Sequence, residues 1–150
     1  MNEELSHFLS YWFQGFAGGI EQMDDSARAV LLKSCGMACA QSYTIQIYRE
    51  AWQASQNIQE FLKNLGQRFP EARYTLQDEN TIDVVYSTCA CDLVRNGWVK
   101  SLHLCSCSVA NLQANFEAGL GYPVTVRMEK TLLQGGAECH FVVILNAKEK

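Results

Sequence analysis

Apolar side chains in the N-terminal part of the chain recur every three or four residues, which is the spacing of amphipathic helices. The first of these helices is expected to end at Gly18-Gly19, and Asp24 can cap a second helix soon afterwards. A third helical stretch covers residues 45–69 and ends at Pro70, and the polar residues 55–57 can divide it in two. This part of the chain is therefore predicted to be helical.

Beyond Pro70 the apolar residues alternate with polar ones, as in a strand with one buried face. A polar turn at residues 78–80 joins the first two strands into a hairpin, and a turn at Gly135-Gly136 joins the last two. Between the two hairpins the spacing becomes helical again. In chain order the predicted elements are two strands, one helix and two more strands: residues 74–76, 82–86, 109–120, 124–128 and 141–145.

Helices followed by an antiparallel sheet that one helix interrupts are typical of the α+β class. We expect N-terminal helices plus a four-stranded antiparallel sheet, with one helix inserted between strands 2 and 3. No repeat or linker is visible, so residues 1–150 are expected to form a single domain, helical over 1–70 and sheet-containing over 71–150. Four apolar residues are expected to share the sheet, with Phe116 packed near it: Leu76, Val84, Val126 and Val143.

Composition narrows the class of partner. The chain has 150 residues, of which 48% are hydrophobic, so it can build a core without disulfide staples. Its net charge of -4 argues against a nucleic-acid partner. No apolar run is long enough to cross a membrane and the N-terminus lacks a basic signal-peptide start, so we expect a cytoplasmic protein with reduced thiols.

Six of the seven cysteines fall into three close pairs, which favours chemistry or sensing over core filling alone. The pairs are Cys35 with Cys39, Cys89 with Cys91, and Cys105 with Cys107. The third pair flanks the predicted start of a helix, where backbone N–H groups and the helix dipole favour a thiolate. His103 precedes Cys105 by two residues and His140 follows Cys139, so each histidine is a candidate base or metal ligand.

A zinc ion is one candidate occupant of this cysteine constellation, because zinc needs three or four such ligands. The candidate ligands are Cys89, Cys91, Cys105 and Cys107, with Cys35, Cys39 and Cys139 as weaker candidates. The spacing is Cys-x-Cys, one residue shorter than the common Cys-x-x-Cys zinc pattern. The alternative is structural, since a free cysteine is a small and readily buried apolar residue.

The first predicted helix has an aromatic stripe that includes Trp12, Phe13 and Phe16. Such a stripe packs into a core or forms the contact face of an oligomer. If the protein forms a dimer, this face of the first helix is the candidate contact.

The segment from residue 86 to residue 145 resembles the L-2-amino-thiazoline-4-carboxylic acid hydrolase family. The shared features are a cysteine after the second strand (Cys89), Leu104-Cys105 before a helix, and a closing Gly-x-x-x-Cys-x-Phe turn from Gly135 to Phe141. The segment is more distantly similar to the 4-vinyl-reductase sensor domains, which share the fold of the TRAPP trafficking subunits.

The resemblance implies an α+β fold, a homodimer, and a pocket for a small molecule between the sheet and the helices. In the sensor domains, zinc is held by cysteines and a glutamate; Cys139 matches the last of these ligands and Cys105 the first. Met128 and Thr131 stand where the middle ligands would fall. For the hydrolases, the resemblance makes Cys105 the candidate nucleophile with Cys89 as its companion, and the nearby His103 is the candidate base.

Three functions follow as hypotheses. The first is a cytosolic small-molecule-binding domain that acts as a cysteine-dependent or metal-dependent hydrolase of a cyclic C–N bond. The second is a non-enzymatic module that senses a ligand or metal and acts through a dimer. The third is a redox-responsive protein whose paired thiols cycle to disulfides. The sequence leaves the substrate, the metal and the presence of any catalysis open.

Overall fold

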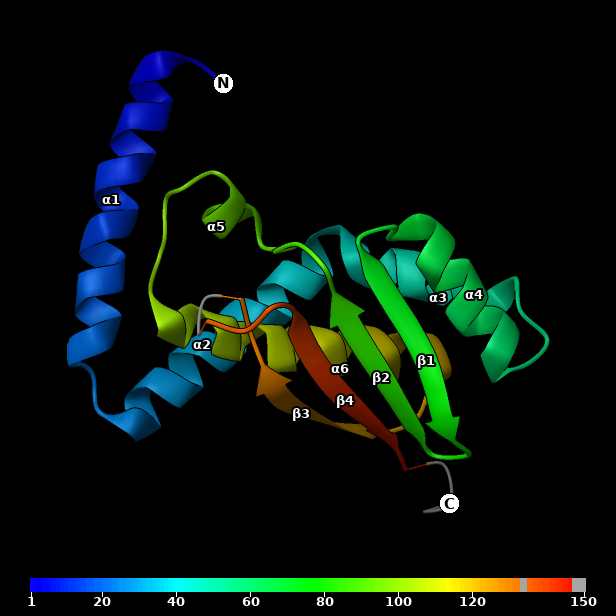
Figure 1. The fold of residues 1–150 in the computed structure, drawn as a ribbon. Helices are drawn as coiled ribbons and strands as arrows, with labels where there is room; N and C mark the ends of the chain where they lie inside the picture. The colour runs from blue at the N-terminus through cyan, green and yellow to red at the C-terminus, as the bar shows by residue number, and fades with distance from the viewer. Residues whose placement is uncertain (133–134, 147–150) are drawn as a thin grey trace.

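The computed structural model describes residues 1–132 and 135–146, and it has a layer of helices against one sheet (Figure 1). The helical elements are α1 (Glu3–Gln22), α2 (Asp25–Cys39), the π-helical turn η1 (Ala40–Thr44), α3 (Ile45–Gln53), α4 (Ile58–Arg68), α5 (Asp92–Arg95), the 3-10 turn η2 (Leu102–Ser106) and α6 (Cys107–Leu120). The strands are β1 (Ala72–Asp78), β2 (Thr81–Tyr86), β3 (Val124–Lys130) and β4 (Cys139–Leu145).

The four strands form one antiparallel sheet in the order β1-β2-β4-β3, which confirms the predicted α+β class. β4 lies between β2 and β3, so the two predicted hairpins pair side by side. The expected sharing of one sheet is confirmed, because Leu76 pairs with Ile82 on β2, and Val126 on β3 pairs with Val143 on β4. α6 is the helix expected between strands 2 and 3; α5 and η2 precede it.

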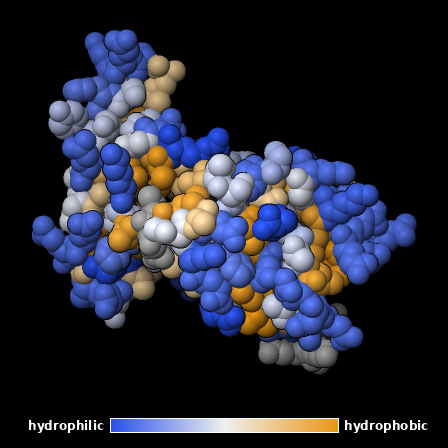
Figure 2. Space-filling view, viewed as in Figure 1, coloured by the Kyte–Doolittle hydropathy of each residue, from blue (hydrophilic) through white to orange (hydrophobic). Residues whose placement is uncertain are grey.

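Helices cover only one face of the sheet. α6 packs against β3, α3 packs against α6, and α4 packs against β1. The inner face carries every second strand residue, such as Ile82 and Val84, and these are fully buried in the main core together with Phe116. The other face carries polar groups, including His140, whose Nε2 lies 3.2 Å from an Asp83 oxygen. Figure 2 accordingly shows hydrophilic side chains interspersed with apolar ones on the side where Figure 1 shows the sheet.

The helix boundaries correct the sequence analysis at one point. α1 does not stop at Gly18-Gly19 but continues to Gln22, because helix continuation over glycine costs only about 1 kcal/mol per residue. The end is set by Arg28, whose guanidinium donates to the carbonyls of Ile20 (2.7 Å) and Met23 (2.7 Å). Asp24 caps α2 as expected.

The break in the third helical stretch is confirmed, since α3 ends at Gln53 and α4 starts at Ile58, capped by Asn57. On α2 the residues that are buried are Leu32 and Gly36, whereas Val30 is 68% exposed. The apolar spacing alone places Val30 along the buried side of the second helix, but in the structure Val30 faces away from the core. The close crossing at Gly36, described below, sets which side of α2 faces the protein.

Candidate functional site

All seven cysteines lie in the described residues, and all are free thiols. Cys35 and Cys39 lie on α2, Cys89 and Cys91 between β2 and α5, Cys105 in η2, Cys107 at the start of α6, and Cys139 at the start of β4. The Cys107 thiol interacts electrostatically with those of Cys91, Cys39, Cys35 and Cys105. The Cys105 thiol does so with those of Cys139, Cys89 and Cys91. The structure therefore brings thiols of all three sequence pairs and Cys139 within electrostatic range of one another near the start of α6, and we call them the thiol cluster.

α2 crosses α6 at Gly36, and this crossing places Cys35 and Cys39 beside Cys107. A Cβ atom on Gly36 would collide with the carbonyl oxygen of Cys107. The two helix backbones are therefore in contact, which a residue with a side chain would prevent. In the sequence, Gly36 and Ala38 beside the first cysteine pair indicate close helix packing, but they do not identify α6 as the partner helix.

A partly buried chain of polar side chains continues from this crossing. The Cys39 thiol hydrogen bonds with Asn111, and the Asn111 side-chain oxygen accepts from the amide of Asn115 at 3.0 Å. The Asn115 oxygen accepts from the Thr44 hydroxyl at 2.9 Å. Thr44 belongs to the π-helical turn η1, a form that is rare and often found near functional sites. The chain ties η1 to α6 and holds α2 in place.

Burial determines the pKa values of these thiols, and it outweighs the expected effect of the helix start. Burial, and then the neighbouring thiols, raise the pKa of Cys107 to about 12. Burial also raises the pKa of Cys39, of Cys91 and of Cys105, so exposure and not acidity distinguishes Cys39 from the others. The helical turns already begin at Leu102, and the Cys107 N–H donates to carbonyls of the preceding turn. The expectation of a stabilised thiolate here was wrong, because the N–H groups near Cys105 and Cys107 are not those of a free helix start.

Cys105 and Cys139 are linked through two adjacent residues, Thr131 and Leu132. The Cys105 thiol hydrogen bonds with the Thr131 side chain. The next residue, Leu132, donates its N–H to the Cys139 sulfur at 3.3 Å. Thr131 is the residue at a position where the resemblance to the sensor domains implies a metal ligand. The segment that carries this hydroxyl therefore joins the two matched cysteines by hydrogen bonding.

The arrangement does not fit a zinc site. Within residues 1–132 and 135–146, no three His, Cys, Asp or Glu side chains are grouped closely enough to hold a metal ion. The raised pKa values also oppose the thiolate form that zinc requires. The assignment of zinc to Cys89, Cys91, Cys105 and Cys107 stays a prediction that this geometry does not favour.

The two histidines have different surroundings. His140 is on the outer face of the sheet, with Nε2 3.2 Å from an Asp83 oxygen, whereas Cys139 points to the core. Adjacent strand residues point to opposite faces, so His140 cannot serve as the base for Cys139. His103 lies in η2, where its backbone N–H donates to the Ser101 hydroxyl at 3.3 Å. The catalytic roles of Cys105, Cys89 and His103 stay predictions.

A second cluster, of three inward-facing tyrosines, adjoins the thiols. Tyr48 comes from α3, Tyr74 from β1 and Tyr86 from β2. The hydroxyls of Tyr48 and Tyr74 are 2.9 Å apart and share a hydrogen bond, and the Tyr86 hydroxyl lies close enough to interact with that of Tyr74. Burial, followed by the neighbouring tyrosine, raises the pKa of each hydroxyl well above its usual value. All three therefore stay protonated at neutral pH, and we call them the tyrosine cluster.

The tyrosine cluster and the thiol cluster meet at one end of the sheet. Tyr86 pairs with Cys139 in the strand register and interacts with it electrostatically. Glu71, just before β1, lies close enough to raise the pKa of the three tyrosines further. We treat this end of the sheet, under η1 and the start of α6, as the candidate site. The sequence analysis assigned Tyr74 and Tyr86 only to strands; their shared inward face was the signal that could have found them.

The surface of the described residues has two hollows away from the tyrosine cluster. One, of about 450 Å³, lies between α1 and the loop that contains Trp98. The other, of about 280 Å³, lies between α2 and α6 near Met37. The tyrosine cluster is packed with aromatic rings instead. Tyr48 contacts Phe61 and Phe116 edge-on, with ring centroids 6.3 and 5.2 Å apart.

We expect iodoacetamide to alkylate Cys39 first and Cys107 last at neutral pH. Cys39 is the exposed thiol of the seven, all of which lie in the described residues. The thiolate is the reactive form, so a pKa of about 12 keeps Cys107 slow until the pH is strongly alkaline. Its alkylation rate should rise with pH through the range 9 to 12.

Mass-spectrometric mapping of alkylated peptides at about pH 7 and about pH 10 measures this order. The urea-unfolded protein is the control, since unfolding exposes every thiol and removes the differences. Labelling of Cys105 before Cys39 in the folded protein at neutral pH would restore the helix-start thiolate and contradict the burial argument.

The fold places the chain in the class of α+β domains with helices on one face of a four-stranded antiparallel sheet. Two solved structures share it. One is the phenol-responsive sensory domain of the transcription activator PoxR with phenol, at 10% identity and a TM-score of 0.61, over 91% of this chain and 74% of that one. The other is trafficking protein particle complex subunit 3 from Naegleria fowleri, covalently bound to palmitic acid, at 12% identity and a TM-score of 0.57, over 97% of each chain.

Of the two resemblances drawn from the sequence, these similarities confirm the more distant one at the level of the fold, which is 4-vinyl-reductase-like and shared with trafficking subunits. The comparisons do not support the thiazoline-carboxylate hydrolase family. No protein-family model matches the chain, and no curated protein matches it. Among the helices of residues 1–132 and 135–146, none combines the length and hydropathy needed to cross a bilayer.

Proposed function

We propose that this chain is a small-molecule-binding domain of the sensory type, and that its ligand site is the tyrosine cluster at the thiol-lined end of the sheet. The observation that carries the proposal is the group of three tyrosine hydroxyls packed between sheet and helices, in which Tyr48 and Tyr74 share a hydrogen bond and Tyr86 lies beside Tyr74. The fold likeness to a sensory domain with bound phenol supports it.

The trio has one hydroxyl proton to spare. Three phenol hydroxyls carry three protons; the hydrogen bond between Tyr48 and Tyr74 uses one, and the contact between Tyr74 and Tyr86 can use at most one more. The third proton can be donated to an acceptor on a ligand, and the surrounding rings can pack edge-on against an aromatic ring. A small aromatic hydroxyl compound offers both groups. It would bind by moving the rings of Tyr48, Phe61 and Phe116 apart, because these rings fill the space.

Such binding would also be a signal. Tyr48 lies on α3, and α3 packs against α6 through Phe116, while Tyr74 lies on β1. A ligand that separates these rings favours a state in which α3 and the sheet stand further apart, and it shifts the population toward that state. The cytoplasmic location and a homodimer belong to this proposal as predictions.

The hydrolase version of the hypothesis has little support at this site. A cysteine nucleophile works as a thiolate, and burial raises the pKa of the Cys105 thiol. The redox alternative is supported by the electrostatic interactions between thiols of different pairs. The order of alkylation described for the candidate site measures how reactive these thiols are.

Thermal unfolding with phenol as the probe tests the proposed function. We expect the unfolding temperature to rise with phenol concentration, because a ligand that binds the native state stabilises it. Tyr74→Phe should abolish most of the rise, since it removes the central hydroxyl of the trio. Tyr11→Phe on α1, where the side chain is 63% exposed, is the matched control and should keep the full rise. An equal rise in wild type and Tyr74→Phe would contradict the proposed site.

A further inference from the structure

α1 stands apart from the rest of the protein (Figure 1). Its contact with the body is narrow: Phe13 stacks on Trp98 with ring centroids 5.9 Å apart, and Ile20 is buried where the helix ends. In proteins, most of the stability of a helix comes from the packing of its apolar face, and α1 has little of this packing against the body. The side of α1 turned away from the body is apolar and uncovered.

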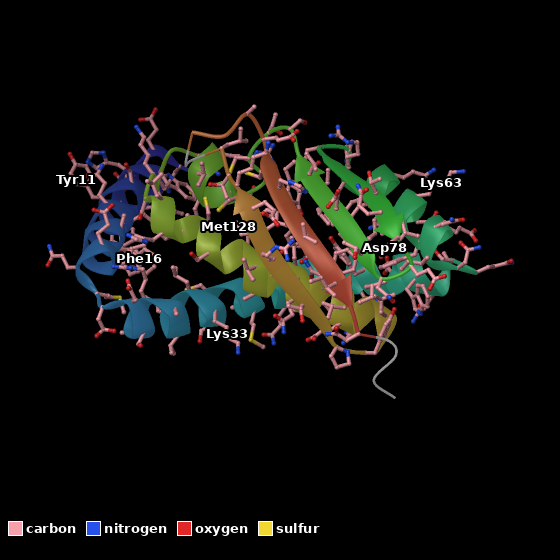
Figure 3. All side chains as sticks on the ribbon, turned by 60° about the horizontal axis from the view of Figure 1, so that its bottom comes forward. Tyr11, Phe16, Lys33, Lys63, Asp78 and Met128 are labelled. Carbon is pink, nitrogen blue, oxygen red and sulfur yellow. The ribbon has the colours of Figure 1, made fainter. Side chains whose placement is uncertain are left out.

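The uncovered side follows a heptad pattern. One stripe has successive spacings of three and four residues, and every member is exposed: Leu5, Phe8, Trp12, Gly15, Gly19 and Gln22. This is the a/d spacing of helices that pair along their length. Tyr11, which borders the stripe, projects from the outer edge of the molecule in Figure 3. Leu5, Phe8 and Trp12 are 46%, 57% and 54% exposed.

The two halves of the stripe are complementary in size. The N-terminal half carries large side chains, whereas the C-terminal half carries Gly15 and Gly19. A Cβ atom on either glycine would meet nothing within 4 Å, so both lie open. Large knobs on one half and open glycine backbone on the other can fill each other only if two such helices run antiparallel.

We propose that α1 pairs with α1 of a second copy of this chain in an antiparallel, two-fold symmetric contact. One two-fold axis, between residues 13 and 14, brings Phe8 opposite the second copy's Gly19 and Trp12 opposite its Gly15. The symmetry then repeats both contacts, which is the self-complementarity that an isologous dimer requires.

The chemistry of the face favours a second copy over a lipid surface. Residues 3–22 contain no Lys or Arg, and an interfacial membrane helix normally carries them on its polar face. The exposed parts of Leu5, Phe8, Tyr11 and Trp12 amount to roughly 400–500 Å². A stable contact buries about 800 Å² per partner, so these side chains supply more than half of it. The glycine backbone and the flanking residues of α1 supply the remainder.

The register allows a sharp test by sedimentation equilibrium. The wild type should be a dimer that dissociates on dilution. Trp12→Glu and Gly19→Glu should each give a monomer, because each places a charge in the contact; glycine at position 19 has open space in the monomer, so this variant should fold. Gln14→Glu makes the same change in charge on another side of α1 and should stay dimeric.

Mixing two variants tests the antiparallel pairing itself. Phe8→Lys and Gly19→Glu alone should be monomers. Mixed, they should form a heterodimer, since the ammonium group introduced by Phe8→Lys would face the carboxylate introduced by Gly19→Glu across the contact. Circular dichroism of each variant shows that loss of the dimer is not loss of the fold.

Four results would each overturn the proposal. They are a monomeric wild type at every concentration, an undisturbed dimer in Gly19→Glu, and no recovery in the mixture of the two variants. The fourth is pelleting of a monomeric wild type with anionic phospholipid vesicles, which would identify a membrane as the partner.

Discussion

Gly36→Ala should lower the free energy of unfolding by about 3 kcal/mol or more. The added methyl group would overlap the carbonyl oxygen of Cys107 and lie 2.9 Å from the Cβ of Ala110. Neither atom is the end of a flexible side chain, so α2 and α6 must separate. Separation would expose Cys107, and its pKa should fall from about 12 toward the ordinary thiol value.

Urea unfolding measures the stability change, and iodoacetamide labelling of Cys107 measures the exposure. Gly66→Ala on α4 is the matched control, because nothing lies within 4 Å of its Cβ position. It should stabilise the protein by up to about 1 kcal/mol, through the better helix propensity of alanine. A loss of stability in Gly36→Ala no larger than about 0.5 kcal/mol would show that the helices do not cross this closely.

Phe116→Ala should cost about 3–5 kcal/mol, which is typical for a fully buried aromatic ring. Phe116 is 0% exposed, and its ring centroid is 5.2 Å from that of Tyr48 and 6.3 Å from that of Tyr74. The substitution leaves a cavity against the tyrosine cluster. Phenol should fill this cavity, so it should raise the unfolding temperature of Phe116→Ala more than that of the wild type.

Phe116→Leu is the control for this prediction. It keeps most of the apolar volume, so it should lose less stability and gain less from phenol. Unfolding temperatures with and without phenol measure both effects. A smaller phenol effect in Phe116→Ala than in the wild type would mean that the cavity and the ligand site are separate.

The fold was largely predictable because the spacing of the apolar residues agreed with the positions of the capping and turn residues. Alternation after Pro70 identified the strands that pair in β1 to β4, and Asp24 and residues 55–57 marked real helix boundaries. The end of α1 was missed because the deciding group, Arg28, acts through tertiary hydrogen bonds. Local propensity at Gly18-Gly19 carries no information about such a contact.

The candidate site was only half predictable. The cysteine pairs were recognisable from their spacing, and in the structure Cys107 interacts electrostatically with members of all three pairs. Their chemistry was misjudged, because a pKa depends on burial that the sequence does not display. Tyr74 and Tyr86 share an inward strand face that the alternation indicates, but their meeting with Tyr48 was not predictable, because it depends on the packing of α3 against the sheet.

The most direct test of the central claim is a crystal structure of the protein grown with phenol. The account predicts a phenol ring beside Tyr48 and Phe116, with its hydroxyl within hydrogen-bonding distance of the tyrosine cluster and those rings moved apart. Phenol bound only in the hollow between α1 and the loop containing Trp98, with the tyrosine cluster unchanged, would contradict it.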